Sequence, residues 1–125
     1  MRLKLISMAV SMVFAFILPG SLHAQKSTTP EDMAKTETDK MKEKLNLTDE
    51  QTIKVGDINL KYARQMNDIR QQNSQASTSE RQANREKIKG LREKKSGELK
   101  TVLTPEQFEQ YQKMEEEMRK EHKKH

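Results

Sequence analysis

The chain has 125 residues, no cysteine, and a formal net charge of +5 at pH 7. The lack of cysteine excludes a disulfide framework, thiol redox chemistry and thiolate metal ligation, so stability must come from packing. Charged residues make up 34% of the chain and aromatic residues only 4%, which is too little apolar material for a large compact core and favours long amphipathic helices or disorder.

Residues 1–24 have the pattern of a secretory signal peptide. Basic residues precede an apolar run from Leu5 to Leu18, and the segment ends in the small residue Ala24, after which we expect cleavage. The run is shorter than the roughly 20 residues that cross a bilayer, which disfavours the alternative of a membrane anchor. We therefore expect a soluble periplasmic chain that begins near Gln25 and carries a net charge of about +3.

The first of four predicted helical segments begins after Thr29. Pro30 suits the first helical position, where its missing N–H costs nothing, and acidic residues follow it. The apolar stripe of this segment is sparse and is interrupted by a charge: Met33, Glu37, Met41 and Leu45. Asn46 is expected to end the helix.

The second segment begins at Thr48 and fades into a polar linker over residues 71–78. Its apolar residues recur at the three- and four-residue steps of an amphipathic helix: Val55, Ile58, Tyr62, Met66 and Ile69. This is the strongest periodic stripe in the first half of the chain, so we expect a long helix with one buried face.

The third segment runs from about Thr78 to Val102, after a capping box formed by Ser77 and Glu80. Its expected inward line keeps helical spacing but includes two polar positions: Asn84, Ile88, Leu91, Lys95, Leu99 and Val102. Glycine weakens a helix by about 1 kcal/mol relative to alanine. Because Gly90 and Gly97 lie inside this segment, we expect a bend or a frayed turn near Gly97.

The fourth segment begins at Thr104 and carries a last apolar stripe: Phe108, Tyr111, Met114 and Met118. No segment shows strand alternation or a hairpin turn dipeptide. The sequence therefore predicts an all-α fold of four helical segments. These form a single helical domain over residues 25–120, followed by a charged tail at residues 121–125.

Two copies of the motif Leu-Thr-x-x-Gln mark the starts of the second and fourth segments. In each copy the threonine can cap the helix, and the glutamine three positions later can reach back to the threonine N–H. The motif residues are Leu47, Thr48, Gln51, Leu103, Thr104 and Gln107. With this motif pair in an exported, methionine-containing helical layout, the chain resembles the Spy/CpxP family of periplasmic stress proteins.

The resemblance implies a thin, extended, curved helical assembly of hairpin type, formed as a homodimer. It also implies an ATP-independent chaperone, or holdase, that suppresses aggregation of unfolded or partly folded envelope proteins under stress. The alternative that the family leaves open is an envelope-stress or metal-sensing regulatory protein that binds one specific partner. We interpret the motif residues as architectural helix starts and not as a client site.

Methionines and basic residues are the candidate client contacts. Met33 and Met41 suit either a mobile flap that contacts varied partners or a thin core. The stretch from Arg81 to Lys100 is net positive by about five. This charge favours either steering of acidic clients or a solvated helix face stabilised by pairs of Lys89 with Glu86 or Glu93. The candidate residues are Met33, Met41, Arg81, Arg85, Lys89 and Arg92.

Other functional classes find less support. The basic segment lacks aromatic stacking residues and a recognition motif, which argues against nucleic-acid binding. The chain also lacks a glycine-rich phosphate loop and a histidine base in its folded part, so we expect no enzymatic activity and no cofactor. His122 and His125, with Glu121 as a third ligand, supply the minimum of a weak divalent metal site. A frayed polar tail is the interpretation that we favour.

Overall fold

The computed structural model describes residues 28–124 and is all-helical over that range. The four helices are α1 (Pro30–Leu45), α2 (Asp49–Asn73), α3 (Thr78–Val102) and α4 (Pro105–His122). The predicted all-α class and the four predicted segments are thus confirmed. The expected signal peptide at residues 1–24 lies outside the described residues, as does His125.

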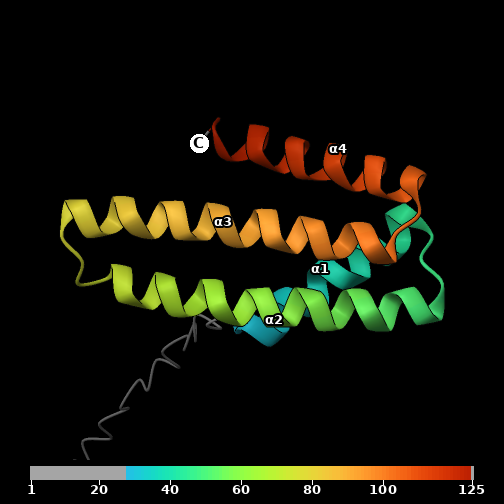
Figure 1. Cartoon of the computed structure of the whole chain (residues 1–125), viewed down its shortest axis with the longest axis horizontal. Helices are drawn as coiled ribbons and strands as arrows, with labels where there is room; N and C mark the ends of the chain where they lie inside the picture. Colours follow the sequence, from blue (N-terminus) through green and yellow to red (C-terminus); the bar gives the residue numbers. More distant parts are fainter. Residues whose placement is uncertain (1–27, 125) are drawn as a thin grey trace, which may run out of the picture.

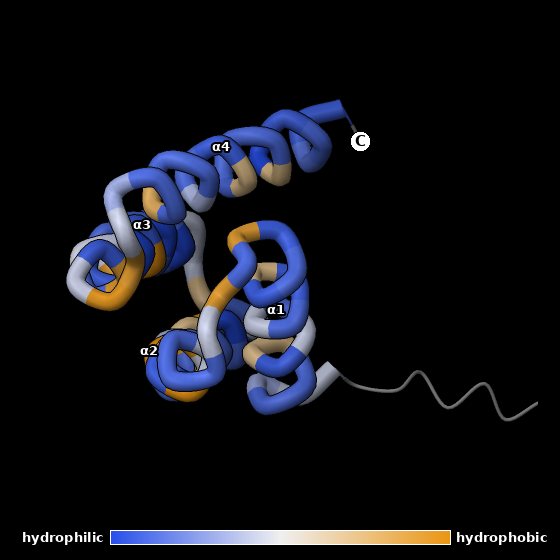
Figure 2. The backbone as a smooth tube through the Cα atoms, turned by 90° about the vertical axis from the view of Figure 1, so that its right-hand side faces the viewer, coloured by the Kyte–Doolittle hydropathy of each residue, from blue (hydrophilic) through white to orange (hydrophobic). Residues whose placement is uncertain are grey.

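The helices form two thin layers. The two longest, α2 and α3, run side by side in opposite directions and are joined by a short turn (Figure 1). Seen from the end of the molecule, α2 and α3 occupy one side, and α1 and α4 the other (Figure 2). Helix α1 packs mainly on α2, whereas α4 touches α1 and α3 more sparsely.

All four helices begin with a capping box. The side chain at each N-cap accepts the backbone N–H three residues later, and the side chain of that later residue accepts the N-cap N–H. The pairs are Thr29 with Asp32, Thr48 with Gln51, Ser77 with Glu80, and Thr104 with Gln107. Because each box satisfies two otherwise unpaired groups, the helix starts are set locally by sequence.

Helix α1 buries Met41 and Leu45 as predicted, but its other buried residues differ from the predicted line. Its buried residues are Ala34, Thr38, Met41 and Leu45, whereas Met33 and Glu37 are only partly buried. The polar Thr38 is accommodated because its hydroxyl donates to the carbonyl of Ala34 at 2.7 Å and accepts from the Asn59 amide at 3.0 Å. The helix ends at Asn46, which adopts the left-handed conformation (φ 51°) that asparagine tolerates better than most residues.

The hydrophobic core gathers at one end of the bundle, where the α1–α2 and α3–α4 turns lie. Its members come from all four helices and from the two turns: Met41, Leu45, Leu47, Val55, Leu99, Leu103, Tyr111 and Met114. None of them comes from the half of the α2–α3 pair nearest the α2–α3 turn. This cluster therefore lies where the helix starts of α2 and α4 meet, while Tyr62 and Met66 of α2 are buried further along the bundle.

Helix α3 is continuous from Thr78 to Val102, so the predicted frayed turn near Gly97 is wrong. The two polar residues in its inward line find partners, as the Asn84 amide donates to the Asn73 Oδ1 at 2.7 Å and the Lys95 ammonium pairs with the Glu37 carboxylate at 2.5 Å. These contacts, together with burial of Leu99, tie α3 to α1 and α2 on either side of its glycines.

Candidate functional site

The two Leu-Thr-x-x-Gln motifs meet, although they lie far apart in the sequence. The side-chain amide of Gln51 donates to the Oε1 of Gln107 at 2.7 Å, and the amide of Gln107 donates back to the Oε1 of Gln51 at 3.2 Å. Both threonines cap their helices, and both leucines are buried, Leu47 at 7% exposure and Leu103 at 6%.

Each motif glutamine also caps the helix that precedes the other motif. Gln51 donates to the carbonyl of Val102 at the end of α3, at 3.2 Å. In the same way Gln107 donates to the carbonyl of Leu45 at the end of α1, at 3.1 Å. The last carbonyls of a helix lack intrahelical partners. The glutamine pair therefore joins the ends of two helices to the starts of two others, in a nearly symmetric arrangement.

Four predicted contact residues form a row along α3. Arg81, Arg85, Lys89 and Arg92 recur at steps of four, four and three, which places them on one side of the helix, and all four are exposed. The predicted pairs of Lys89 with Glu86 or Glu93 do not form. Within residues 28–124, none of the four basic side chains takes part in an ion pair.

The two predicted methionine contacts are not brought to this row. Met41 is fully buried at 0% exposure and belongs to the core, so it cannot contact a client from the surface of this fold. The core interpretation therefore holds for Met41, and the flap interpretation does not. Met33 is partly buried near the start of α1, on a different helix from the basic row.

A polar cluster joins α2 to α3. The Glu98 carboxylate accepts from the Lys61 ammonium at 2.5 and 2.7 Å and from the Tyr62 hydroxyl at 2.9 Å. These hydrogen bonds lower the pKa of Glu98 below its usual value, and the hydrogen bond to Glu98 raises the pKa of Lys61. The ion pair persists at neutral pH and links the two long helices.

Tyr111 anchors α4 to the rest of the molecule. Burial, followed by the negative charges of Glu115 and Glu37, raises the pKa of Tyr111 far above its usual value, while the charge of Arg92 acts in the opposite sense. The Tyr111 ring also lies 6.1 Å, between centroids, from the ring of Phe108. Tyr111 is therefore a neutral core residue at physiological pH.

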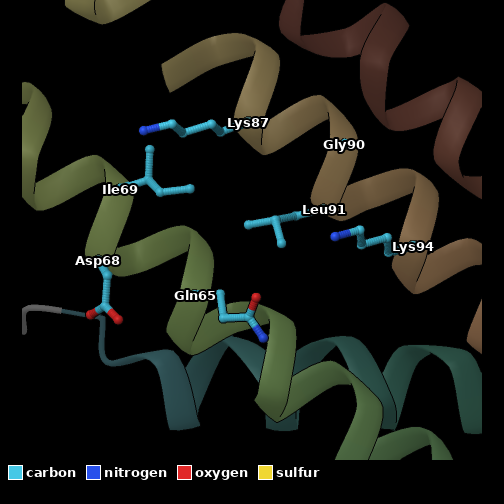
Figure 3. A pocket seen from close by; sticks show the side chains of 7 residues that line it. All are labelled: Gln65, Asp68, Ile69, Lys87, Gly90, Leu91 and Lys94. Atoms are coloured by element: carbon cyan, nitrogen blue, oxygen red, sulfur yellow. The ribbon is translucent and has the colours of Figure 1, made fainter. Parts of the chain in front are cut away.

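An open groove lies between α2 and α3 and has a volume of about 480 Å³. Its lining comes from these two helices alone: Gln65, Asp68, Ile69, Lys87, Gly90, Leu91 and Lys94 (Figure 3). Sequence reasoning did not single out this groove. Ile69 and Leu91 were identified only as apolar positions of two separate helices, and the pairing register of α2 and α3 brings them together.

Sequence reasoning also missed a buried polar contact between α1 and α2. Asn59 is fully buried and donates to Thr38. The Oδ1 of Asn59 has no hydrogen-bond partner among residues 28–124. The only available signal was position, since Asn59 lies four residues after the buried Val55 and three before the buried Tyr62.

The tail does not assemble a metal site within the part of the chain that the structure describes. His122 is exposed at the last position of α4. No cluster of three or more metal-ligating side chains is found among residues 28–124. Over the same range, no helix has the length and apolar character needed to cross a bilayer.

Comparison with known families gives one match. Residues 21–111 match a family described as a domain of unknown function, DUF4890. The chain belongs to this family. The DUF4890 match contains both Leu-Thr-x-x-Gln motifs and the glutamine pair that joins them. No curated protein and no solved structure matches the chain, and the family description assigns no activity, so function has to be argued from geometry.

Proposed function

We propose that this DUF4890 chain is an exported, ATP-independent periplasmic holdase that suppresses aggregation of unfolded envelope proteins under stress. It acts by transient binding, without catalysis and without a cofactor. The observation that carries the proposal is the row of four exposed basic side chains on α3, which form no ion pair with any residue of the described range 28–124. The motif pair that resembles Spy/CpxP proteins supports the same function.

Unpaired basic side chains suit a holdase for a physical reason. A cation that is already in an ion pair must give up that partner before it attracts another carboxylate, whereas a free cation raises the local concentration of acidic chains directly. Accessible apolar surface is present as well, since Ile53 is 67% exposed on α2 and Ile69 and Leu91 line the α2–α3 groove. Charge for attraction and modest apolar contacts for retention together favour weak, reversible binding.

A homodimer with a thin, curved shape is part of the proposal. The core of one chain is concentrated at one end of the bundle, so a second copy would supply further burial along the long helices. Two copies would also place two basic rows on one assembly, which strengthens binding to a long unfolded chain by multivalency.

A second candidate is a regulatory protein that senses envelope stress or metal through one partner. The exposed His122 at the end of α4 favours this alternative. It predicts one saturable partner or a metal-dependent change, whereas a holdase acts on several unrelated clients in the absence of metal.

Aggregation assays with two unrelated denatured client proteins distinguish the candidates. The purified protein is added in increasing amounts without ATP, with and without a chelator. We expect suppression of both clients in both conditions, and unchanged suppression by the double variant His122→Ala and His125→Ala. Suppression of neither client, or suppression only with added metal, would support the regulatory alternative.

A further inference from the structure

The α2–α3 groove has an apolar floor. Ile69 of α2 and Leu91 of α3 point toward each other across it (Figure 3). Both side chains are only partly buried, so the floor stays accessible from solvent. An accessible apolar strip between two antiparallel helices offers a track along which a peptide segment can lie.

One wall of the groove is positively charged. Lys87 and Lys94 lie about two helical turns apart on α3, roughly 10 Å along the axis, and both are exposed. Neither takes part in an ion pair among the described residues. On the opposite wall the carboxylate of Asp68 points away from both ammonium groups (Figure 3). The α3 wall therefore carries two positive charges, against the one negative charge of Asp68 on the α2 wall.

We propose that this groove is the docking site for acidic, partly apolar peptide segments, a proposal that rests on the holdase function. An apolar side chain of the segment lies over Ile69 and Leu91. Carboxylates on either side of it pair with Lys87 and Lys94. These two lysines differ from the exposed row that begins at Arg81, so the row attracts acidic chains at long range and the groove makes the close contacts.

Glycine at position 90 keeps the groove open. A Cβ atom added there would meet nothing within 4 Å, so a larger side chain at position 90 would project into free space within the groove without disturbing the core. Gly97 lies about two turns further along α3. It also has open space around it, but it does not line the groove. Position 90 can therefore be used to fill the groove, and position 97 serves as the control outside it.

Binding of a fluorescent peptide measured by anisotropy tests the proposal. The probe is a twelve-residue peptide with glutamates flanking leucine and isoleucine, and its counterpart has lysines in place of the glutamates. We expect the acidic peptide to bind more tightly than the basic one. Gly90→Leu should weaken binding of the acidic peptide about tenfold or more, and Gly97→Leu should leave it within about twofold.

The lysines are tested separately. The double variant Lys87→Gln and Lys94→Gln should weaken binding of the acidic peptide and flatten its dependence on salt, because the screened charges are lost.

Leucine is a better helix former than glycine, so neither leucine variant should melt below the wild type. Melting by circular dichroism therefore separates loss of binding from loss of folding.

Three results would contradict the proposal that the groove binds acidic peptides. Equal binding of the acidic and basic peptides would do so, as would unchanged binding by Gly90→Leu. Dissociation of a dimer by Gly90→Leu, seen by sedimentation, would assign the groove to a second copy instead.

The groove and the holdase function can fail independently. If the wild type suppresses aggregation and Gly90→Leu does so equally well, the holdase proposal stands and the groove proposal falls. If the wild type fails to suppress aggregation but binds the acidic peptide in a Gly90-dependent way, the holdase proposal falls and the groove remains.

Discussion

The side-chain amides of Gln51 and Gln107 each carry out three tasks at once. Each Oε1 accepts the N–H of its own capping threonine at 3.0 Å. Each Nε2 donates to the other glutamine and to a helix-terminal carbonyl. Only a side chain that has both a donor and an acceptor at this length can do so, which explains why glutamine stands at this position in both motifs.

Replacing Gln51 with glutamate tests this explanation. Gln51→Glu keeps the acceptor for the Thr48 N–H but loses both donors, so we expect the free energy of unfolding to fall by about 1–3 kcal/mol in urea titrations. The control is Gln65→Glu, because Gln65 is exposed on the same helix and makes no hydrogen bond in the described structure. Equal stability of the two variants would show that the amide pair contributes nothing.

Met41 and Met33 provide a second comparison of single residues. Met41 is fully buried in the core cluster, so Met41→Ala should lower the free energy of unfolding by about 2–5 kcal/mol through lost contacts and a residual cavity. Met33 is only partly buried, and Met33→Ala should cost less than about 1 kcal/mol. Chemical denaturation of both variants checks the order, and a larger cost at Met33 would contradict the observed packing of α1.

The ion pair of Glu98 should make the stability of the protein depend on pH in the acid range. Hydrogen bonds from Lys61 and Tyr62 lower the pKa of Glu98 in the folded protein. The contribution of Glu98 to stability is therefore present above its ordinary pKa of 4.5, and it is lost as the pH falls toward the lowered pKa of the folded state. The melting temperature of Glu98→Gln should lie below that of the wild type at pH 7. The difference between the two proteins should shrink below about pH 4.5.

Glu93→Gln is the matched control for this titration. Glu93 is exposed on the same helix and forms no ion pair among residues 28–124. Its replacement should leave the melting temperature close to that of the wild type at every pH. A gap between Glu98→Gln and wild type that widens on acidification would contradict the assigned role of Glu98.

At the scale of helices, sequence patterns predicted starts and lengths well because both are local properties. Capping boxes fix where each helix begins, and apolar spacing shows how far it continues. The inward face of α1 was predicted correctly at Met41 and Leu45 but not at Thr38. Burial of Thr38 depends on a partner on another helix, the buried Asn59 of α2, which donates a hydrogen bond to it. The α2–α3 groove was missed for a related reason, since periodicity within one helix does not give the register between two.

Because α3 is continuous, we expect Gly97 to weaken the helix and alanine at this position to stabilise it. In a straight helix Gly97→Ala should raise the free energy of unfolding by about 0.5–1 kcal/mol, since alanine has the higher helix propensity and open space surrounds the new Cβ. Urea denaturation checks the sign. A loss of stability would indicate that the helix needs a flexible or bent turn at Gly97.

At the scale of the whole molecule, a core at one end supports two long helices whose outer surfaces stay open. The motif residues of the candidate site were predictable, because a repeated motif is visible in the sequence. The exposure of the basic row could also be predicted from the sequence. Its lack of ion pairs within residues 28–124 could not, because oppositely charged side chains that are close in a helix need not pair. The open surfaces of α2 and α3 are where we propose that flexible partners bind.

We propose above all that the basic row of α3 attracts unfolded acidic chains and so suppresses their aggregation without ATP. The most direct measurement is light scattering from a denatured acidic client, with wild type and with the triple variant Arg81→Gln, Arg85→Gln and Lys89→Gln. We predict dose-dependent suppression by the wild type at near-stoichiometric amounts, and clearly weaker suppression by a triple variant that melts normally. Undiminished scattering at a large excess of wild type, or equal suppression by both proteins, would contradict the claim.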